Sequence, residues 1–401
     1  MKEPLSEKRD KNRHLLFLIG NLQYGGAERV VINLSRFFAG LGGYRVSILT
    51  IEDKADDYSI PDGVKVKRLC LKRGNILGKI LSLKKGAYEL KRFVANHQVD
   101  IVLSFMEWSN AINLWAKKLG SKHRAYINVR TRIKVHYRNI NGIFGFFLFK
   151  RLAGYIDKIF VNSPDTKDDI VSLFRINTSK VDVIYNPIDL NEVERLSRED
   201  VQEDWFQQRD IPIVINVASF TRPKGHKYLL RAFARVAAHR PVRLVLIGDE
   251  YPTRDSRRIK LKLQSEVKRL KIVDRVLFLG WRDNPYKYLS RSSLFVLSSV
   301  YEAFPNTLLE AMACGLPAIS FDCPSGPSEI LSPREDRKDD IVRARYGILV
   351  KEKNEESLSK AIEELLDDRE MMTRYAKAGL ERSRQFSLPA VAKDYEALLK
   401  R

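Results

Sequence analysis

The chain is short of the features that mark secreted, membrane-spanning and metal-binding proteins. Its three cysteines, Cys70, Cys314 and Cys323, have spacings that fit neither a disulfide framework nor a zinc knuckle. The apolar run near its start, Leu15–Ile19, is too short for a signal-peptide core or a membrane span. We therefore expect a reducing, cytoplasmic compartment.

Acidic residues are scarce in one long stretch. The 401 residues carry a formal net charge of +21, and between Gly63 and Arg151 there are 20 Lys and Arg against the three acids Glu89, Asp100 and Glu107. Such a surface attracts nucleic acid, anionic lipid headgroups or a phosphorylated substrate, or it is only a soluble basic face. We find no stacking platform or recognition helix, so a nucleic-acid partner is not expected.

Short aliphatic or β-branched runs alternate with helix-period segments along the whole chain. This alternation predicts an α/β fold with mainly parallel sheets covered by helices. The length and the ordinary composition, 44% hydrophobic and 30% charged, favour two domains. The predicted strands are 14–19, 44–50, 64–69, 100–105, 124–129, 157–163 and 181–186, then 211–218, 242–248, 275–280, 293–299, 316–321 and 346–350.

The domain boundaries follow from a polar stretch without strand pattern. We predict a doubly wound, Rossmann-like domain over 1–190, a linker over 191–210, a second such domain over 211–385, and a C-terminal helix over 386–401 that can pack back on the first domain. Ligands collect outside the carboxyl ends of such strands, so two facing domains would enclose a cleft.

A glycine pair follows the first predicted strand. Gly25 and Gly26 turn the chain directly before a helix, where close backbone approach and unpaired amides suit a diphosphate. The spacing is neither Gly-x-Gly-x-x-Gly nor a P-loop, which argues against a dinucleotide oxidoreductase. A plain tight turn explains the pair equally well.

The second domain opens with another strand-to-helix turn, in which cations gather. Arg222, Lys224 and Lys227 lie beside Gly225 in "SFTRPKGHKYLLRAF". Cations at a helix start oppose the helix dipole, so they favour a bound anion over a merely solvated basic turn.

Two carboxylates flank a predicted helix start in "YEAFPNTLLEAM". Pro305 suits the first helical position, Glu302 precedes it, and Glu310 lies more than a turn inside the helix. Acceptor groups on both sides of amide donors suit a ligand with hydroxyls at both ends and phosphates between, which describes a nucleotide sugar. A helix with one capping and one surface glutamate is the alternative.

The combination resembles the retaining glycosyltransferases of the GT-B fold, specifically the large family 4 that builds bacterial surface glycans. The resemblance covers nearly the whole chain. It is carried by "GGAERVVINLS", "DKIFVNS", "IYNPID", "SFTRPKGHKYLLRAF", "LIGDE", "FLGW" and "SSVYEAFPNTLLEAMACGLPAIS". The most specific part is the pair Glu302 and Glu310, which are separated by seven residues.

The resemblance implies roles for individual residues. It implies that Glu310 binds ribose hydroxyls and that Glu302 contacts the transferred sugar. It implies that Lys224 grips the diphosphate. The other donor-binding residues implied in this way are Gly25, Gly26, Phe304, Pro305, Asn306, Thr307 and, beside the nucleobase, Trp281.

Two positions depart from the family pattern. The family usually has an arginine five residues before the diphosphate lysine, where this chain has Ser219, and our hypothesis is that Arg222 reaches the same phosphate. Many members also have a histidine after the fifth strand, near the reacting carbon. Here the chain reads "YINVRTR", and we expect Arg130 to replace the histidine electrostatically, although it cannot act as a general base.

No metal or other cofactor is expected, because the chain lacks an Asp-x-Asp string beside the diphosphate site. Retention is implied by the resemblance, and Glu302, Lys224, Arg222 and Arg130 are the predicted catalytic residues. We expect a UDP-sugar donor, with GDP-mannose as the alternative. In the simplest mechanism, cations and helix N-termini stabilise the departing diphosphate. An oxygen of this diphosphate takes the acceptor's proton.

The acceptor is expected on the basic first domain, with Glu107 and Asn128 as candidate contacts. For Glu107 the alternative is a solvated glutamate at a helix start. Two stretches, 74–97 and 141–155, mix apolar residues with lysines, which suits an anionic membrane or a lipid diphosphate unless the apolar residues belong to the core. We therefore predict a peripheral enzyme at the inner face of the plasma membrane that elongates a polyprenyl-diphosphate-linked or lipopolysaccharide-type glycan. A soluble transferase with a non-lipid acceptor is the alternative.

Overall fold

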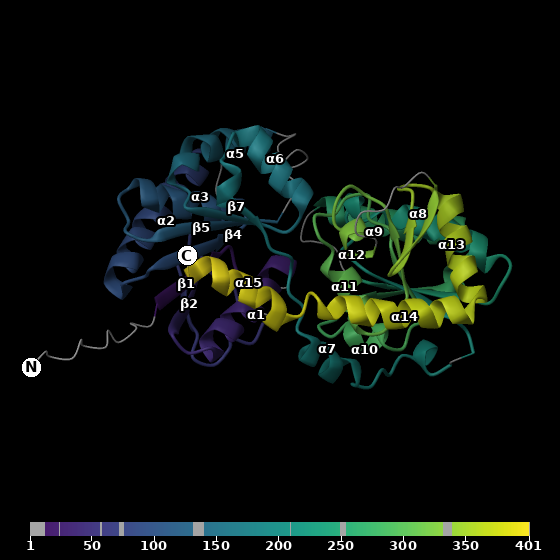
Figure 1. The fold of residues 1–401 in the computed structure, drawn as a ribbon. Coiled ribbons are helices and arrows are strands. Elements are labelled where there is room, and N and C mark those ends of the chain that lie inside the picture. Colours follow the sequence, from purple (N-terminus) through teal and green to yellow (C-terminus); the bar gives the residue numbers. More distant parts are fainter. Residues whose placement is uncertain are drawn as a thin grey trace, which may run out of the picture. The chain divides into compact units, whose positions relative to one another are not determined.

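A computed structural model describes residues 13–23, 25–56, 58–71, 76–130, 140–208, 210–248, 254–331 and 339–400. The chain forms two compact units. The first runs to Pro187 and takes in the chain again from Val391, and the second comprises Ile188–Ala390. Each unit is an open sheet with helices on both faces (Figure 1).

The first unit has a seven-stranded, all-parallel sheet in the order β3-β2-β1-β4-β5-β6-β7. Continuous apolar runs such as Leu15–Ile19 are buried on both faces, as expected of parallel strands. The strands are β1 (Arg13–Ile19), β2 (Tyr44–Thr50), β3 (Lys65–Arg68), β4 (Ile101–Phe105), β5 (Arg124–Val129), β6 (Lys158–Val161) and β7 (Val181–Val183).

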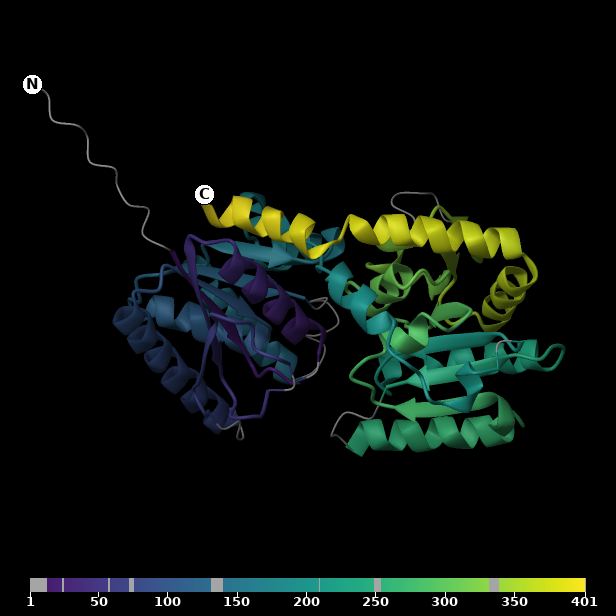
Figure 2. The same ribbon diagram turned by 90° about the horizontal axis from the view of Figure 1, so that it is seen from below.

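Helices cover both faces of this sheet (Figure 2). One face carries α2 (Ile76–His97), α3 (Glu107–Lys118), α5 (Ile140–Leu152) and α6 (Pro164–Phe174), which pack on side chains such as Leu16, Leu18 and Ile127. The opposite face carries α1 (Gly26–Gly40) and the part of α15 (Leu388–Lys400) that belongs to this unit. On that face the Tyr395 ring lies 5.2 Å from the Phe160 ring.

The second unit repeats the design with the strand order β10-β9-β8-β11-β12-β14-β13. Six strands are parallel and β13 runs antiparallel to β14. The strands are β8 (Ile213–Val217), β9 (Arg243–Ile247), β10 (Val276–Gly280), β11 (Leu294–Leu297), β12 (Ala318–Phe321), β13 (Ile341–Ala344) and β14 (Gly347–Val350).

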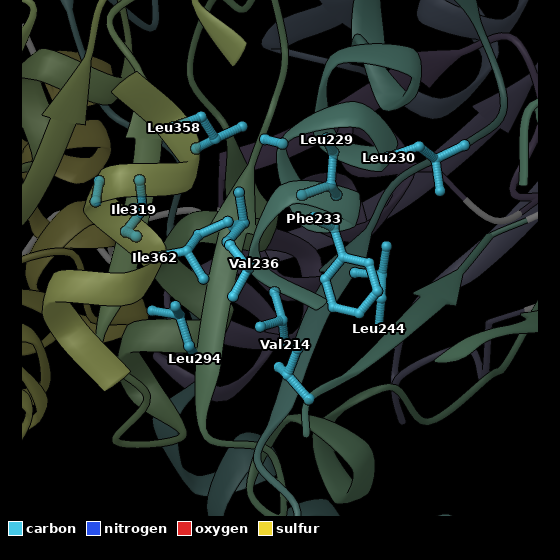
Figure 3. Packing of buried hydrophobic residues seen from close by; sticks show 14 of the residues in the cluster. Val214, Leu229, Leu230, Phe233, Val236, Leu244, Leu294, Ile319, Leu358 and Ile362 are labelled. Carbon is cyan, nitrogen blue, oxygen red and sulfur yellow. The ribbon is translucent and has the colours of Figure 1, made fainter. Parts of the chain in front are cut away.

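A large part of the core of the second unit lies between one face of this sheet and three helices. Side chains of α8 (His226–Ala237) and α13 (Glu355–Asp367) pack onto strand residues such as Val214, Leu244 and Ile319 (Figure 3). Side chains of α9 (Arg254–Arg269) belong to the same cluster. The other helices of the unit are α7 (Leu190–Ser197), α10 (Tyr286–Leu289), α11 (Asn306–Ala313), α12 (Pro327–Leu331) and α14 (Arg369–Arg384).

All thirteen predicted strands are present, and one strand was missed. β13 has the sequence Ile-Val-Arg-Ala, which is too short to give a strand pattern by itself. It forms because the Arg345–Tyr346 turn folds it back onto β14. Antiparallel edge strands of this kind are common on parallel sheets.

The predicted linker over 191–210 is also structured. Residues from Ile188 onward belong to the second unit, and α7 occupies much of the stretch. Asp189 caps α7 by accepting a hydrogen bond from the Glu192 amide at 3.1 Å, and Val193 is buried. The polar composition therefore reflects a short surface helix with one buried side.

The predicted C-terminal helix over 386–401 is α15, whose residues from Val391 onward belong to the first unit. Across the residues that the structure describes, every helix is too short or too polar to span a bilayer.

Candidate functional site

In each unit, several of the predicted site residues lie at the point where the strand order of the sheet reverses. In each sheet the order changes direction at the first strand, between β1 and β4 and between β8 and β11. Loops at the carboxyl ends of such neighbouring strands diverge to opposite faces and leave room for a ligand. Gly25 and Glu107 follow β1 and β4, while Lys224 and Glu302 follow β8 and β11.

The helices that begin at these four loops share a second property. The N-cap residues of α1, α3, α8 and α11 are Gly25, Met106, Gly225 and Pro305, and none of them makes a side-chain capping hydrogen bond. By contrast α6, α7, α13 and α14 are each capped by a serine, aspartate or asparagine side chain. Helix starts without a side-chain cap suit anion binding by backbone amides.

The glycine turn of the first unit lies beside a carboxylate. Gly25 is extended and its carbonyl accepts a hydrogen bond from the Tyr58 hydroxyl at 3.2 Å. The Glu28 carboxylate occupies the space that a side chain at Gly25 would need. Burial raises the pKa of Glu28, and Glu52 nearby raises it further. A diphosphate at Gly25 and Gly26 would have to share this position with Glu28.

The acceptor candidates lie at the ends of β4 and β5. Glu107 is the first residue of α3, directly after Met106, whose φ of 72° is rare for a residue with a side chain. Asn128 is buried in β5, and its Oδ1 accepts a hydrogen bond from the Tyr395 hydroxyl at 3.0 Å. Arg130 follows β5 and its guanidinium lies 5.1 Å from the Phe105 ring centroid.

The basic turn of the second unit is held by backbone contacts. Ser219 follows β8, and Arg222–Lys224 form a single 3₁₀ turn before α8. The Lys224 carbonyl accepts a hydrogen bond from the Ser298 hydroxyl at 3.0 Å, and the Pro223 carbonyl accepts one from the Val300 amide at 2.8 Å. The turn is thereby fixed to the end of β11, and the Arg222 side chain is exposed.

Lys224 and Glu302 form an ion pair. Lys224 Nζ lies 2.6 Å from Glu302 Oε1, and the two side chains are 27% and 11% exposed. The Glu302 carbonyl in turn accepts a hydrogen bond from the Ser325 hydroxyl at 2.9 Å. The structure thus brings together the residues assigned to the diphosphate and to the transferred sugar.

The start of α11 differs from the prediction in one detail. Pro305 is the N-cap, with φ −78° and ψ 104°, and Asn306 is the first helical residue, so the prediction of Pro305 at the first helical position was wrong. An extended proline satisfies the same constraint on φ one residue earlier. Phe304 is buried, Asn306 and Thr307 are half-buried, and Glu310 is buried within the helix.

Trp281 directly follows β10. Its indole N–H donates a hydrogen bond to Asp283 Oδ1 at 3.0 Å, and the side chain is 43% exposed. β10 lies beside β9 in the sheet order, two strands from β8. The position at a carboxyl strand end is consistent with contact to one end of a ligand.

The sequence did not point to two residues that pack against the backbone of the candidate site. Gly326, with φ 76°, packs so tightly that an added Cβ would lie 2.8 Å from Pro305 Cδ. His226 is buried at the start of α8 against the Phe220 ring, and burial lowers its pKa to about 3. Gly326 lies in "PSGPS", a composition that predicts a turn. His226 lies in "KGHK", which does not indicate that the histidine is buried.

Known families match both units. Residues 24–192 match the family model described as Glycosyltransferase Family 4, and residues 197–382 match the one described as Glycosyl transferases group 1. A protein of Campylobacter jejuni, named N-acetylgalactosamine-N,N'-diacetylbacillosaminyl-diphospho-undecaprenol 4-alpha-N-acetylgalactosaminyltransferase, is 30% identical over 380 residues, 94% of this chain and 96% of its own. The chain is a family 4 glycosyltransferase.

Solved structures confirm the predicted GT-B fold of this glycosyltransferase. Sucrose-phosphate synthase of Thermosynechococcus elongatus has a TM-score of 0.79 at 20% identity and covers 97% of this chain and 98% of its own. HepE of Anabaena in complex with UDP has a TM-score of 0.75 at 18% identity and covers 96% of this chain and 99% of its own.

Proposed function

We propose that this glycosyltransferase moves a sugar, with retention, from a nucleotide-sugar donor to a lipid-linked glycan at the inner face of the plasma membrane. A UDP-sugar is the favoured donor. The observation that carries the donor part is the meeting of Lys224, Glu302 and the start of α11 at the ends of β8 and β11. This arrangement offers a cation, a carboxylate and helix amides to one ligand.

The comparisons support the choice of donor and acceptor. HepE of Anabaena, which has the same fold, is described as a complex with UDP. The Campylobacter relative is named for transfer to a diphospho-undecaprenol-linked glycan. We carry both properties over to this chain as proposals, with GDP-mannose as the alternative donor.

In the proposed mechanism Lys224 and Arg222 stabilise the charge that develops on the departing diphosphate. Backbone amides at the starts of α8 and α11 add to this stabilisation without reorganising during the reaction. An oxygen of the departing diphosphate takes the acceptor's proton on the face where the new bond forms. Glu302 orients the sugar, and no metal ion is required.

The membrane part rests on two exposed helix stripes of the first unit. On α2, Leu81, Lys84, Lys85, Tyr88 and Arg92 are exposed at helical spacing, and Leu81 and Tyr88 are 65% and 55% exposed. On α5, Phe147 is 64% exposed and is followed at the same spacing by exposed Lys150 and Arg151. Exposed apolar side chains among cations suit an anionic lipid surface. Other apolar residues predicted there are core: Leu83 of α2 and Leu152 of α5 are buried.

Calorimetric titration with UDP and with GDP tests the donor. We expect micromolar binding of UDP that is lost in Glu310→Ala, because the buried carboxylate is proposed to hold the ribose hydroxyls. Glu381→Ala, an exposed glutamate of α14, is the matched control and keeps the wild-type affinity. Binding of neither nucleotide would overturn the proposed donor site.

Sedimentation with vesicles tests the membrane part. We expect the protein to sediment with vesicles that contain anionic phosphatidylglycerol and to be released as salt is raised. The alternative is a soluble transferase with a non-lipid acceptor, which the likeness to sucrose-phosphate synthase supports. Absence of sedimentation at low salt would favour that alternative.

A further inference from the structure

Tyr395 of α15 reaches the end of β5 from the far end of the chain. Its side chain is fully buried, its hydroxyl donates a hydrogen bond to Asn128 Oδ1 at 3.0 Å, and it accepts one from Arg130 Nη2 at 2.9 Å. Its ring packs edge-on against Phe160. One phenol therefore fixes two of the predicted site residues at once.

Arg130 is a half-buried cation with a buried Nε atom, and it has no carboxylate partner in the described part of the chain. Among the described residues it donates hydrogen bonds to the Asn186 amide oxygen, to Asn128 Oδ1 at 3.4 Å and to the Tyr395 hydroxyl, all of which are neutral. Burial lowers the pKa of the guanidinium. A half-buried charge that no opposite charge balances loses part of its hydration without compensation, so the site is suited to an anion.

Two buried donors of this cluster lack partners among the described residues. They are Asn128 Nδ2 and Arg130 Nε. Because Tyr395 donates to Asn128 Oδ1, it fixes which atom of the amide is the acceptor and which is the donor. Buried polar atoms are almost always satisfied, so these two N–H groups call for an acceptor-rich ligand.

The backbone around Asn128 is held in place by a second set of hydrogen bonds. The Asn128 carbonyl accepts a hydrogen bond from Asn110 Nδ2 of α3 at 2.8 Å. Asn128 pairs in register with Phe105, and the strained Met106 follows. Strain of this kind persists where the surrounding structure fixes it, and it is typical of ligand sites.

We infer that Tyr395 is a positioning residue that holds Arg130 and Asn128 as an anion site for a phosphate or diphosphate group in the first unit. The inference deepens the proposed function, since it rests on a phosphorylated ligand reaching this unit. Arg130 supplies the charge, Asn128 supplies a further donor, and Tyr395 acts only through these two side chains.

Pyrophosphate titration in a Lys224→Ala host tests the inference, because this host lacks the lysine of the second unit's donor site. We expect pyrophosphate still to bind, binding to be lost when Arg130→Ala is added, and binding to weaken about 10-fold when Tyr395→Phe is added, as the loss of a hydrogen bond to a charged group predicts. Tyr375→Phe, another buried tyrosine but in the second unit, is the control and leaves the affinity unchanged.

Two further measurements separate positioning from general stability. An Arg130→Lys host lacks the planar guanidinium group that Tyr395 orients. In this host Tyr395→Phe should therefore weaken pyrophosphate binding much less than it does in the host that keeps Arg130. A loss of affinity that is the same in both hosts, or that follows a fall in the melting temperature of the variant, would show a merely structural role and overturn the inference. Unchanged affinity in Tyr395→Phe, or no pyrophosphate binding in the Lys224→Ala host, would also overturn it.

The outcome is independent of the donor test. If pyrophosphate binds through Arg130 while UDP and GDP do not bind the wild-type protein, the proposed donor site fails and the anion site stands. If a nucleotide binds and Tyr395→Phe has no effect on pyrophosphate, the donor site stands and the present inference fails.

Discussion

Lys224 Nζ and Glu302 Oε1 lie 2.6 Å apart at the ends of β8 and β11. The family resemblance gives these residues different partners, the diphosphate for the lysine and the sugar for the glutamate. A lysine ammonium is a compact charge with three donors, so a diphosphate would compete with Glu302 for it. We therefore expect the ion pair to influence the affinity for the donor.

We predict that Glu302→Gln tightens the binding of UDP about 3-fold to 10-fold while it abolishes sugar transfer. The neutral amide removes the competing charge from Lys224, and a partly buried charged hydrogen bond is worth about 1 kcal/mol or more. Lys224→Ala should weaken UDP binding at least about 10-fold. Calorimetric titration measures both changes.

The matched control for the glutamate is Glu352→Gln, which breaks the exposed pair between Lys353 and Glu352 and should leave UDP binding unchanged. Weaker binding of UDP to Glu302→Gln would mean that the carboxylate supports the nucleotide instead of competing with it.

Gly225 is required by the geometry of the basic turn. Its φ is 63°, and an added Cβ would overlap the Ser298 carbonyl oxygen. We predict that Gly225→Ala lowers the free energy of unfolding of the second unit by about 3 kcal/mol, because backbone strain and a clash with main chain add together. Urea unfolding followed by circular dichroism measures the change.

Gly315→Ala separates the two contributions to this cost. Gly315 has a similar φ of 74°, but an added Cβ would meet open space. Its substitution should cost only about 1 kcal/mol, the price of the backbone conformation alone. Equal costs at the two positions would show that the contact with Ser298 relaxes freely.

Most strands could be predicted from the sequence because a buried parallel strand is largely apolar, as in Leu15–Ile19 and Leu294–Leu297. β13 could not be predicted because it depends on pairing with β14. The linker was misread for a related reason: the amphipathic α7 presents only Val193 as a buried residue, and its cap at Asp189 has to be recognised first.

The candidate site divides in the same way. Glu302, Glu310 and Lys224 could be selected because they lie at fixed spacings in contiguous motifs. Their mutual distance could not be predicted, since Lys224 and Glu302 are 78 residues apart in sequence. The role of Tyr395 could not be predicted from the sequence, because its partners Asn128 and Arg130 lie more than 260 residues earlier in the chain. Contacts of that separation arise only from the packing of α15.

Two buried histidines predict a loss of stability in mild acid. Burial lowers the pKa of His226 to about 3 and that of His123 to about 4, below the ordinary value of 6.5. In the interval below 6.5 the unfolded chain binds protons that the folded chain does not. The contribution of each neutral histidine is therefore complete above about pH 6.5 and is lost as the pH falls towards the folded value, by at most about 1.4 kcal/mol per pH unit.

Urea unfolding at a series of pH values between 7.5 and 5 measures this loss. His226→Gln should flatten the pH dependence of the second unit, and His123→Gln that of the first, where glutamine can still donate to Asn113 Oδ1. His239→Gln, at an exposed site, is the control. A pH dependence that stays the same in both buried variants would contradict the prediction.

The exposed stripe of α2 gives a prediction for membrane binding that separates local charge from total charge. Lys84→Glu with Lys85→Glu places two acids within the stripe, where they repel anionic lipid, and each nearby cation is worth about 1 kcal/mol at such a surface. We expect sedimentation with phosphatidylglycerol vesicles to weaken at least about 10-fold. The control, Lys377→Glu with Lys393→Glu, also changes two exposed lysines and lowers the net charge equally, from +21 to +17 (21 − 4), but lies on α14 and α15. If both variants lose binding equally, the attraction comes from the total charge of the protein and the stripe has no special part in it.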